Sequence, residues 1–249
     1  MTRYGRLVIS MTELTEYRWD ESGSGMARDG VYGFAKSYHE SGRQEHPGGR
    51  PPYFFRGSLA DLQIGRQVSL AVGGGEHTLN EEFELILVLE RECETKQWEL
   101  RGFTFGSDLT NLHEFRTDPS RIMWAKAPTA AVLPHYWDAA NLPSSTGVAI
   151  SKSRAGQFIE KYDSRLGADH LTIPLDAIPQ MVSSFHGAGG FDRILLFTGA
   201  APGFESRQGC VAPADGDALR LDIPWLGEWM ECLVCQSAQP TFNAMAGSS

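Results

Sequence analysis

The chain has 249 residues, a length compatible with one large β-rich domain or with a small lobe beside a larger one. Its formal charge of −9, without a local cluster of Lys and Arg to offset it, removes the electrostatic attraction on which nucleic-acid and anionic-membrane binders depend. Hydrophobic residues make up 41% of the chain and 27 Gly and 13 Pro punctuate it, so the composition predicts a globular protein with many turns and short strands.

No apolar run approaches the roughly 20 residues that a membrane-spanning helix needs, and charged residues interrupt the N-terminus too early for a signal peptide. We therefore expect a cytoplasmic protein. Of the four cysteines, only Cys232 and Cys235 are close together. Residues 229–236 read as a strand, in which positions three apart point to opposite faces, so two packed reduced thiols are a better interpretation than a zinc or redox site.

The first half of the chain alternates short apolar runs with stretches rich in Gly, Pro and polar residues. Residues 7–11 and 31–34 are apolar and predict strands, and the polar stretch 21–30 between them predicts a loop. Residues 42–52 are rich in breakers and are a candidate for a mobile active-site loop. The aromatic residues of 52–59 then predict another strand, and the glycine run 73–75 predicts a turn rather than a phosphate cradle.

The second half begins with the clearest pattern, in which residues 81–89 and 98–105 predict two antiparallel strands joined by a charged, solvated turn at 90–97. A helix is expected in the region 155–166, and residues 171–186 form a further apolar segment. Strands are expected at 191–199 and, as a closing pair, within 218–235.

Two carboxylates, Glu82 and Glu84, enter an otherwise apolar strand, and the two-residue repeat of a strand puts both on one face. Partly buried like charges repel each other and usually stay ionised only when a cation offsets them, although a solvated sheet edge also explains an isolated pair. Asp108 ends the second strand of the hairpin, which can return it to the two glutamates. Three carboxylates without a His or Cys partner suit a hard ion, Mg²⁺ first, with Mn²⁺ or Ca²⁺ as alternatives.

An ordered set of motifs resembles those of the fumarylacetoacetate hydrolase superfamily. The Glu-x-Glu pair is followed by 102–108, which is similar to a "GYTxGND" segment, and by Ala125-Lys126, which is similar to an "AK" pair. Residues 33–39, 52–57 and 191–203 resemble the superfamily's "GxNYxxH", "PxxFxKP" and "GDxIxTGTPxG" segments. The resemblance covers about Gly33 to Cys235, and it marks the chain as a divergent member.

This resemblance implies an α+β, mainly β fold, a mixed β-sandwich or β-roll with short helices, and usually a homodimer. The expected domains are an N-terminal strand and loop at 1–30, a catalytic domain at 31–240 and a flexible tail at 241–249. It also implies a small-molecule substrate, a 2-oxo acid or β-dicarbonyl compound, that reacts through a metal-bound enolate, because a divalent ion that binds two vicinal oxygens stabilises the charge of such an intermediate.

Site roles follow from the same resemblance. His39 is the candidate general acid or base, and its neighbour Glu40 can orient or replace it. Lys126, in an apolar setting, would supply a positive charge beside the metal. Thr198 and Gly199 would offer a hydroxyl and a backbone N–H to a substrate carboxylate, and Arg56 would be a second anion contact.

The substrate-recognition residues diverge from the superfamily pattern. The Arg that usually follows the metal Asp and helps to hold a substrate carboxylate is absent from 109–113, and residues 127–129 replace the usual "SFD". The Glu expected shortly after the His is Gly42, although Glu40 and Glu45 lie close by. Arg56 or Arg116 can replace the missing anchor only from a different backbone position.

Three functions remain open at this stage. The first is C–C bond hydrolysis or decarboxylation of a diketo or acylpyruvate-like substrate. The second is dehydration or isomerisation of a 2-oxo sugar acid or specialised metabolite. The third is a non-catalytic small-molecule binding protein, which the carboxylate triad disfavours, because three clustered acids without a cation would only destabilise the fold.

Overall fold

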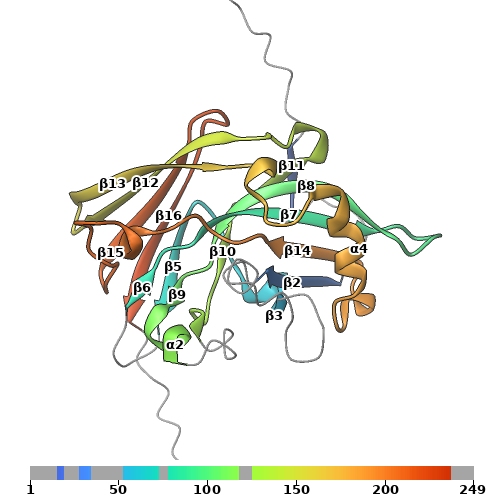
Figure 1. Ribbon diagram of the computed structural model, residues 1–249, viewed down its shortest axis with the longest axis horizontal. Coiled ribbons are helices and arrows are strands. Elements are labelled where there is room, and N and C mark those ends of the chain that lie inside the picture. The colour runs from blue at the N-terminus through green and yellow to red at the C-terminus, as the bar shows by residue number, and fades with distance from the viewer. Residues whose placement is uncertain (1–15, 20–27, 35–52, 73–77, 118–124, 237–249) are drawn as a thin grey trace, which may run out of the picture.

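The computed structural model describes residues 16–19, 28–34, 53–72, 78–117 and 125–236. Two large sheets, each containing antiparallel and parallel pairs, account for most of this part of the chain, and a two-stranded sheet accompanies them (Figure 1). The helices are short. The protein therefore consists mainly of β-strands in mixed sheets, accompanied by short helices, as the sequence predicts.

The larger sheet has nine strands among the described residues, and the hairpin of β7 (Phe83–Arg91) and β8 (Trp98–Ser107) forms its centre. β14 (Arg193–Phe197) pairs antiparallel with β7 and parallel with β2 (Asp29–Phe34). The other members are β1 (Glu16–Arg18), β3 (Tyr53–Ser58), β4 (Gln63–Ile64), β10 (Ala131–Val132) and β11 (His135–Asp138).

The smaller sheet has five strands in the order β13-β12-β15-β16-β5. Their bounds are β5 (Gln67–Val72), β12 (Thr146–Arg154), β13 (Gln157–Leu166), β15 (Asp217–Ile223) and β16 (Glu228–Gln236). In β15 buried and partly exposed residues alternate, as expected of a strand with one face on the core. β6 (Leu79–Asn80) and β9 (Thr110–Asn111) form the two-stranded sheet.

Short helical segments connect and cover the sheets. The α-helices that lie wholly within the described residues are α2 (Leu112–Thr117) and α4 (Ile178–Ser183). Single 3₁₀ turns are η1 (Leu59–Asp61), η3 (Ala139–Asn141), η4 (Ala168–His170), η5 (Leu175–Ala177), η6 (Ala188–Gly190) and η7 (Phe204–Ser206). None of the helices in the described part of the chain combines the length and the apolar character that a membrane span requires.

The core lies on both faces of β7. Leu85, Leu87 and Leu89 belong to a cluster that also contains Leu219 and Leu221 of β15, so the two sheets pack face to face there. The residues between them, Ile86 and Val88, belong to a second cluster on the opposite face. A strand buried on both faces explains why residues 84–89 are nearly all apolar, and it makes a carboxylate in this strand costly.

Most of the predicted strands are confirmed. The hairpin at 81–105, the strand at 52–59, the strand at 191–199 and the closing pair within 218–235 correspond to β7 and β8, β3, β14, and β15 and β16. Cys232 is buried and Cys235 half-buried, as opposite faces of β16 require. The strand predicted at 7–11, the loop at 42–52, the turn at 73–75 and the tail at 241–249 lie outside the described residues.

The helix expected within 155–166 is wrong, because these residues form a hairpin turn and β13. Ala155 and Gly156 have φ values of 48° and 77°. Positive φ at both central residues defines the tight turn that suits a two-residue hairpin, here between β12 and β13. From Glu160 to Leu166, exposed and less exposed residues alternate along β13 with a period of two.

Gly106 in β8 tests whether close packing of the larger sheet governs stability. A Cβ at Gly106 would lie 2.2 Å from the Ala131 carbonyl oxygen and 2.5 Å from Ile86 Cδ1, so Gly106→Ala should lower the free energy of unfolding by about 1–3 kcal/mol. A Cβ at Gly147 in β12 meets nothing within 4 Å, and Gly147→Ala should be neutral or slightly stabilising. Urea denaturation of both variants provides the measurement, and equal effects would contradict the packing argument.

Candidate metal centre

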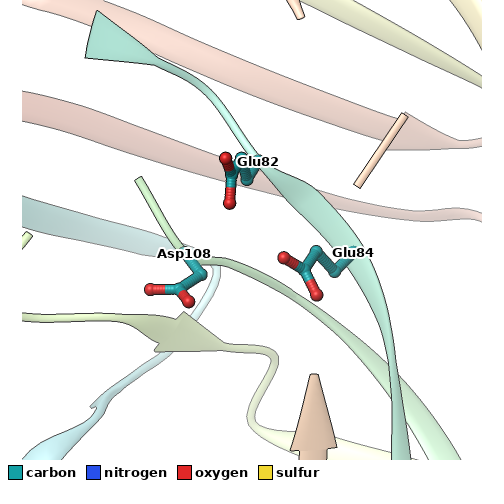
Figure 2. Close-up of side chains that lie close together, drawn as sticks. All are labelled: Glu82, Glu84 and Asp108. Atoms are coloured by element: carbon teal, nitrogen blue, oxygen red, sulfur yellow. The ribbon is translucent and has the colours of Figure 1, made fainter. Parts of the chain in front are cut away.

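The register of the β7–β8 hairpin brings three carboxylates together. Phe83 pairs with Ser107 and Glu84 with Gly106, so Asp108, directly after β8, lies opposite Glu82 and donates its backbone N–H to the Glu82 carbonyl at 2.9 Å. Carboxylate oxygens of Glu82, Glu84 and Asp108 lie within 4.8 Å of one another. Figure 2 shows that the two glutamates come from one segment, Glu82 just before β7 and Glu84 within it, and that all three side chains lie close together.

A second backbone contact places Lys126 beside these carboxylates. Residue Lys126 forms an antiparallel bridge with Thr110, and the next residue, Ala127, donates its N–H to the Leu109 carbonyl at 2.8 Å. The Lys126 ammonium forms ion pairs with Glu82 and, at 3.0 Å, with Asp108 Oδ2. Because only 5% of the Lys126 side chain is exposed, this cation is fixed in the cluster rather than solvated.

Arg56 of β3 supplies a second buried cation. One terminal guanidinium nitrogen lies 2.9 Å from Asp108 Oδ1 and donates to the Ala127 carbonyl at 3.0 Å. Despite these ion pairs, both Asp108 oxygens are buried without a hydrogen-bond partner in the described part of the chain. Buried, converging carboxylate oxygens are what a hard divalent ion requires, so the residues present fit such an ion.

Glu84 is more buried than Glu82, and a third segment of the chain, the turn after β14, holds it in place. Its Oε2 accepts the backbone N–H of Gly199, just after β14, at 2.6 Å. Gly199 has a φ of 93°, which side-chain-bearing residues rarely adopt, so the turn that delivers this N–H depends on glycine. The contact fixes the orientation of the Glu84 carboxyl group.

Burial and charge shift the pKa values of two members of the cluster in ways that matter for metal binding. Burial, the largest cause, and repulsion from Glu82 and Asp108 raise the pKa of Glu84 to about 8 against the opposing effects of Lys126 and the Gly199 N–H. Burial on its own would lower the pKa of Lys126, but the carboxylates of Asp108, Glu82 and Glu84 raise it above the ordinary value. Without a divalent ion, Glu84 is therefore largely protonated at neutral pH, whereas Lys126 is charged.

The residues predicted to bind substrate differ from one another in the contacts they make in the structure. Arg56 forms an ion pair with Asp108, and the Gly199 N–H donates a hydrogen bond to Glu84. Both groups therefore contact predicted metal ligands. The Thr198 hydroxyl donates to the Leu85 carbonyl at 2.7 Å, and Thr198 and Leu85 line a cavity together. Arg116 pairs with Glu205 on an exposed part of α2. Contacts of these groups with a substrate stay predictions, as do the roles of His39 and Glu40, which lie outside the described residues.

Asn80 is a member of this site that our sequence analysis missed. Its side-chain amide donates to Glu82 Oε1 at 3.3 Å, while Lys126 contacts the other oxygen of Glu82. The signal was present in the sequence, because Asn80, Glu82 and Glu84 follow one another at intervals of two residues, the spacing that puts side chains on one face of an extended segment.

No family model and no curated protein matches the chain. Solved structures do match it. A 2-keto-3-deoxy-D-arabinonate dehydratase, complexed with magnesium and 2,5-dioxopentanoate, has a TM-score of 0.65 and 18% identity over 86% of this chain and 75% of its own. A 5-carboxymethyl-2-hydroxymuconate delta-isomerase from Mycobacterium smegmatis has a TM-score of 0.51 and 17% identity over 86% and 80%.

A third similar structure comes from a Burkholderia cenocepacia protein assigned as a fumarylpyruvate hydrolase. It has a TM-score of 0.50 and 19% identity, and the match covers 95% of this chain and 98% of that one. The resemblance to the fumarylacetoacetate hydrolase superfamily is thereby confirmed as a likeness of fold, shared with enzymes that carry out dehydration and isomerisation. The acidic cluster has the arrangement of donors that a metal ion would require.

The raised pKa of Glu84 predicts how pH and metal act on stability. The unfolded carboxyl loses its proton near its ordinary pKa of 4.5 and the folded one near 8, so the metal-free protein should lose stability as pH rises between these values. Glu84→Gln should reduce that loss and leave the smaller part that comes from Glu81, whose pKa burial raises to about 7. Mg²⁺ should stabilise the wild type more at pH 8 than at pH 6, because the ion competes with the Glu84 proton.

Differential scanning calorimetry across this pH range, with and without Mg²⁺, provides the test. Glu99→Gln, a substitution at an exposed acid in β8 of the same hairpin, is the matched control and should behave as the wild type. A full Mg²⁺ response in Glu84→Gln, or no divalent-ion binding to the wild type at all, would show that the cluster is not a metal site.

Proposed function

We propose that this protein is a divergent member of the fumarylacetoacetate hydrolase superfamily, a divalent-metal-dependent enzyme that acts on a 2-oxo acid or β-dicarbonyl compound. Mg²⁺ is the preferred ion at Glu82, Glu84 and Asp108, since all three donors are carboxylate oxygens. The observation that carries the proposal is the convergence of these oxygens in a setting where Glu84 and Asp108 are buried.

The protein side chains have separate tasks in such a reaction. A divalent ion bound at the cluster would act as a Lewis acid and stabilise the negative charge of an enolate. Lys126 is a poor base, because the carboxylates around it raise its pKa, and it serves as a fixed cation that holds Glu82 and Asp108 in place. Arg56 and the Gly199 N–H position Asp108 and Glu84 in the same way.

Proton transfer at the substrate is then assigned to a group other than Lys126. We propose His39 as general acid or base, with Glu40 beside it. An imidazole changes charge near neutral pH, which suits removal of a proton next to a carbonyl.

Two reaction outcomes follow from a common enolate. C–C bond hydrolysis or decarboxylation is our first candidate, supported by the likeness to the assigned fumarylpyruvate hydrolase over nearly the full length of both chains. Dehydration or isomerisation is the second. The higher TM-score of the dehydratase complexed with magnesium and 2,5-dioxopentanoate supports it.

Enolisation itself can be measured without knowledge of the natural substrate. With Mg²⁺, the wild type should exchange the C3 protons of 2-oxobutanoate for deuterium in D₂O, as followed by proton NMR. Lys126→Met should slow this exchange by roughly 100-fold, the typical effect of removing one group that stabilises developing charge. It should keep its affinity for Mg²⁺, because the three carboxylates remain.

Lys126→Arg is the matched variant that keeps the charge and should retain part of the activity. Calorimetric Mg²⁺ binding without exchange, and without turnover of any compound in a panel of 2-oxo and diketo acids, would favour a non-catalytic binding protein instead.

The engaged positions of Arg56 and Arg116 predict substrate preference. Neither guanidinium is free to hold a second carboxylate, so dicarboxylic 2-oxo and diketo acids should be poorer substrates than monocarboxylic ones of equal length. Steady-state kcat/KM values at saturating Mg²⁺ provide the comparison. Efficient turnover of a dicarboxylic acid that is lost in Arg116→Ala would show that the anchor has moved to α2 rather than disappeared.

A further inference from the structure

A cavity of about 250 Å³ lies on the opposite face of β7 from the metal cluster. Leu85 lines it, whereas the neighbouring Glu84 points to the other face. Thr198 and Gly199 line it from the end of β14, and residues 164–167 line it from the end of β13. The volume corresponds to roughly eight water molecules, which is room for a small organic molecule.

The cavity has a cationic end built by Arg165, Ser145 and His170. Arg165 Nε donates to the Ser145 hydroxyl oxygen at 2.8 Å, and this oxygen lies 2.6 Å from His170 Nε2. A hydroxyl can accept one hydrogen bond and donate another, so Ser145 can accept from Arg165 and donate to His170 at the same time. The serine thereby fixes the orientation of both side chains, which themselves line the cavity.

The Arg165 guanidinium is available to a ligand. No carboxylate in the described ranges forms an ion pair with it, although the chain as a whole carries a formal charge of −9. Ser145 engages Nε and leaves the two terminal nitrogens, which present parallel N–H donors at the spacing of a carboxylate. The lining also contains apolar residues, among them Leu85, Leu171 and Pro202.

We propose that this cavity binds a small aliphatic carboxylate, with Arg165 holding the carboxylate and the leucine-lined wall packing against the hydrocarbon part. An inorganic anion would leave the apolar wall unused, and a neutral ligand would leave the guanidinium unpaired. None of the predicted metal ligands lines the cavity, so carboxylate binding there can be tested in the absence of a metal. Gly199 borders both sites, because its backbone lines the cavity and its N–H holds Glu84.

The probe for this site is sodium butyrate, which lacks the oxo group needed to chelate a metal. Titration of ¹⁵N-labelled protein in buffer freed of divalent ions on a chelating resin should give saturable amide shifts at Gly167 and Gly199. n-Butanol and inorganic phosphate should bind more weakly, because each satisfies only one end of the cavity. Arg165→Ala should weaken butyrate binding by about tenfold or more, as expected when a charge-assisted pair is lost.

The matched control is Lys161→Ala, which removes an exposed positive charge from the same strand, three positions before the first residue that lines the cavity, Ser164. It should bind butyrate as the wild type does. Equal affinity in Arg165→Ala and the wild type would overturn the proposal, as would phosphate binding more tightly than butyrate or shifts confined to residues around Asp108.

Discussion

The pairing of β7 with β8 is the constraint on which the site depends, because it forces three carboxylates together where water is largely excluded. Two strands in any other register would separate Glu82 and Glu84 from Asp108. The cost of this arrangement is met by two buried cations, Lys126 and Arg56, both of which contact Asp108. The charges of the site are therefore part of the packing of the larger sheet.

The segment after β14 forms hydrogen bonds with side chains on both faces of residues 81–84, where the chain enters β7. Glu84 accepts the Gly199 N–H at 2.6 Å, and Glu81 accepts the Phe204 N–H at 2.6 Å together with the Tyr162 hydroxyl at 2.9 Å. A Cβ at Gly203 would lie 2.8 Å from the Glu81 carboxylate, so only glycine fits this close approach. Burial raises the pKa of Glu81 to about 7, because desolvation disfavours the charged form of this acid as it does that of Glu84.

The sequence predicted those parts of the fold and site that depend on local periodicity. The hairpin, the shared face of Glu82 and Glu84, and the return of Asp108 all follow from a period of two and one turn. The strand at 157–166 was mistaken for a helix, because it is an exposed edge strand whose charged residues carry little hydrophobic pattern. The contacts of Arg56 and Gly199 were out of reach, since they join segments 52 and 115 residues from their partners, and only the three-dimensional structure determines such pairs.

The balance of charge in the cluster links metal binding to the kind of substrate the site can accept. With Glu84 protonated, the remaining carboxylates of Glu82 and Asp108 are matched by Lys126 and Arg56, so the metal-free cluster is close to neutral. Exchange of the Glu84 proton for a divalent ion adds one net positive charge in a buried setting, where it attracts anions more strongly than it would in water. A neutral carbonyl compound would be stabilised little by that charge. A 2-oxo acid would be stabilised electrostatically when it binds and again when its enolate forms. The two buried cations would thus make the metal-bound cluster favour anionic substrates even though Arg56 and Arg116 already pair with protein carboxylates.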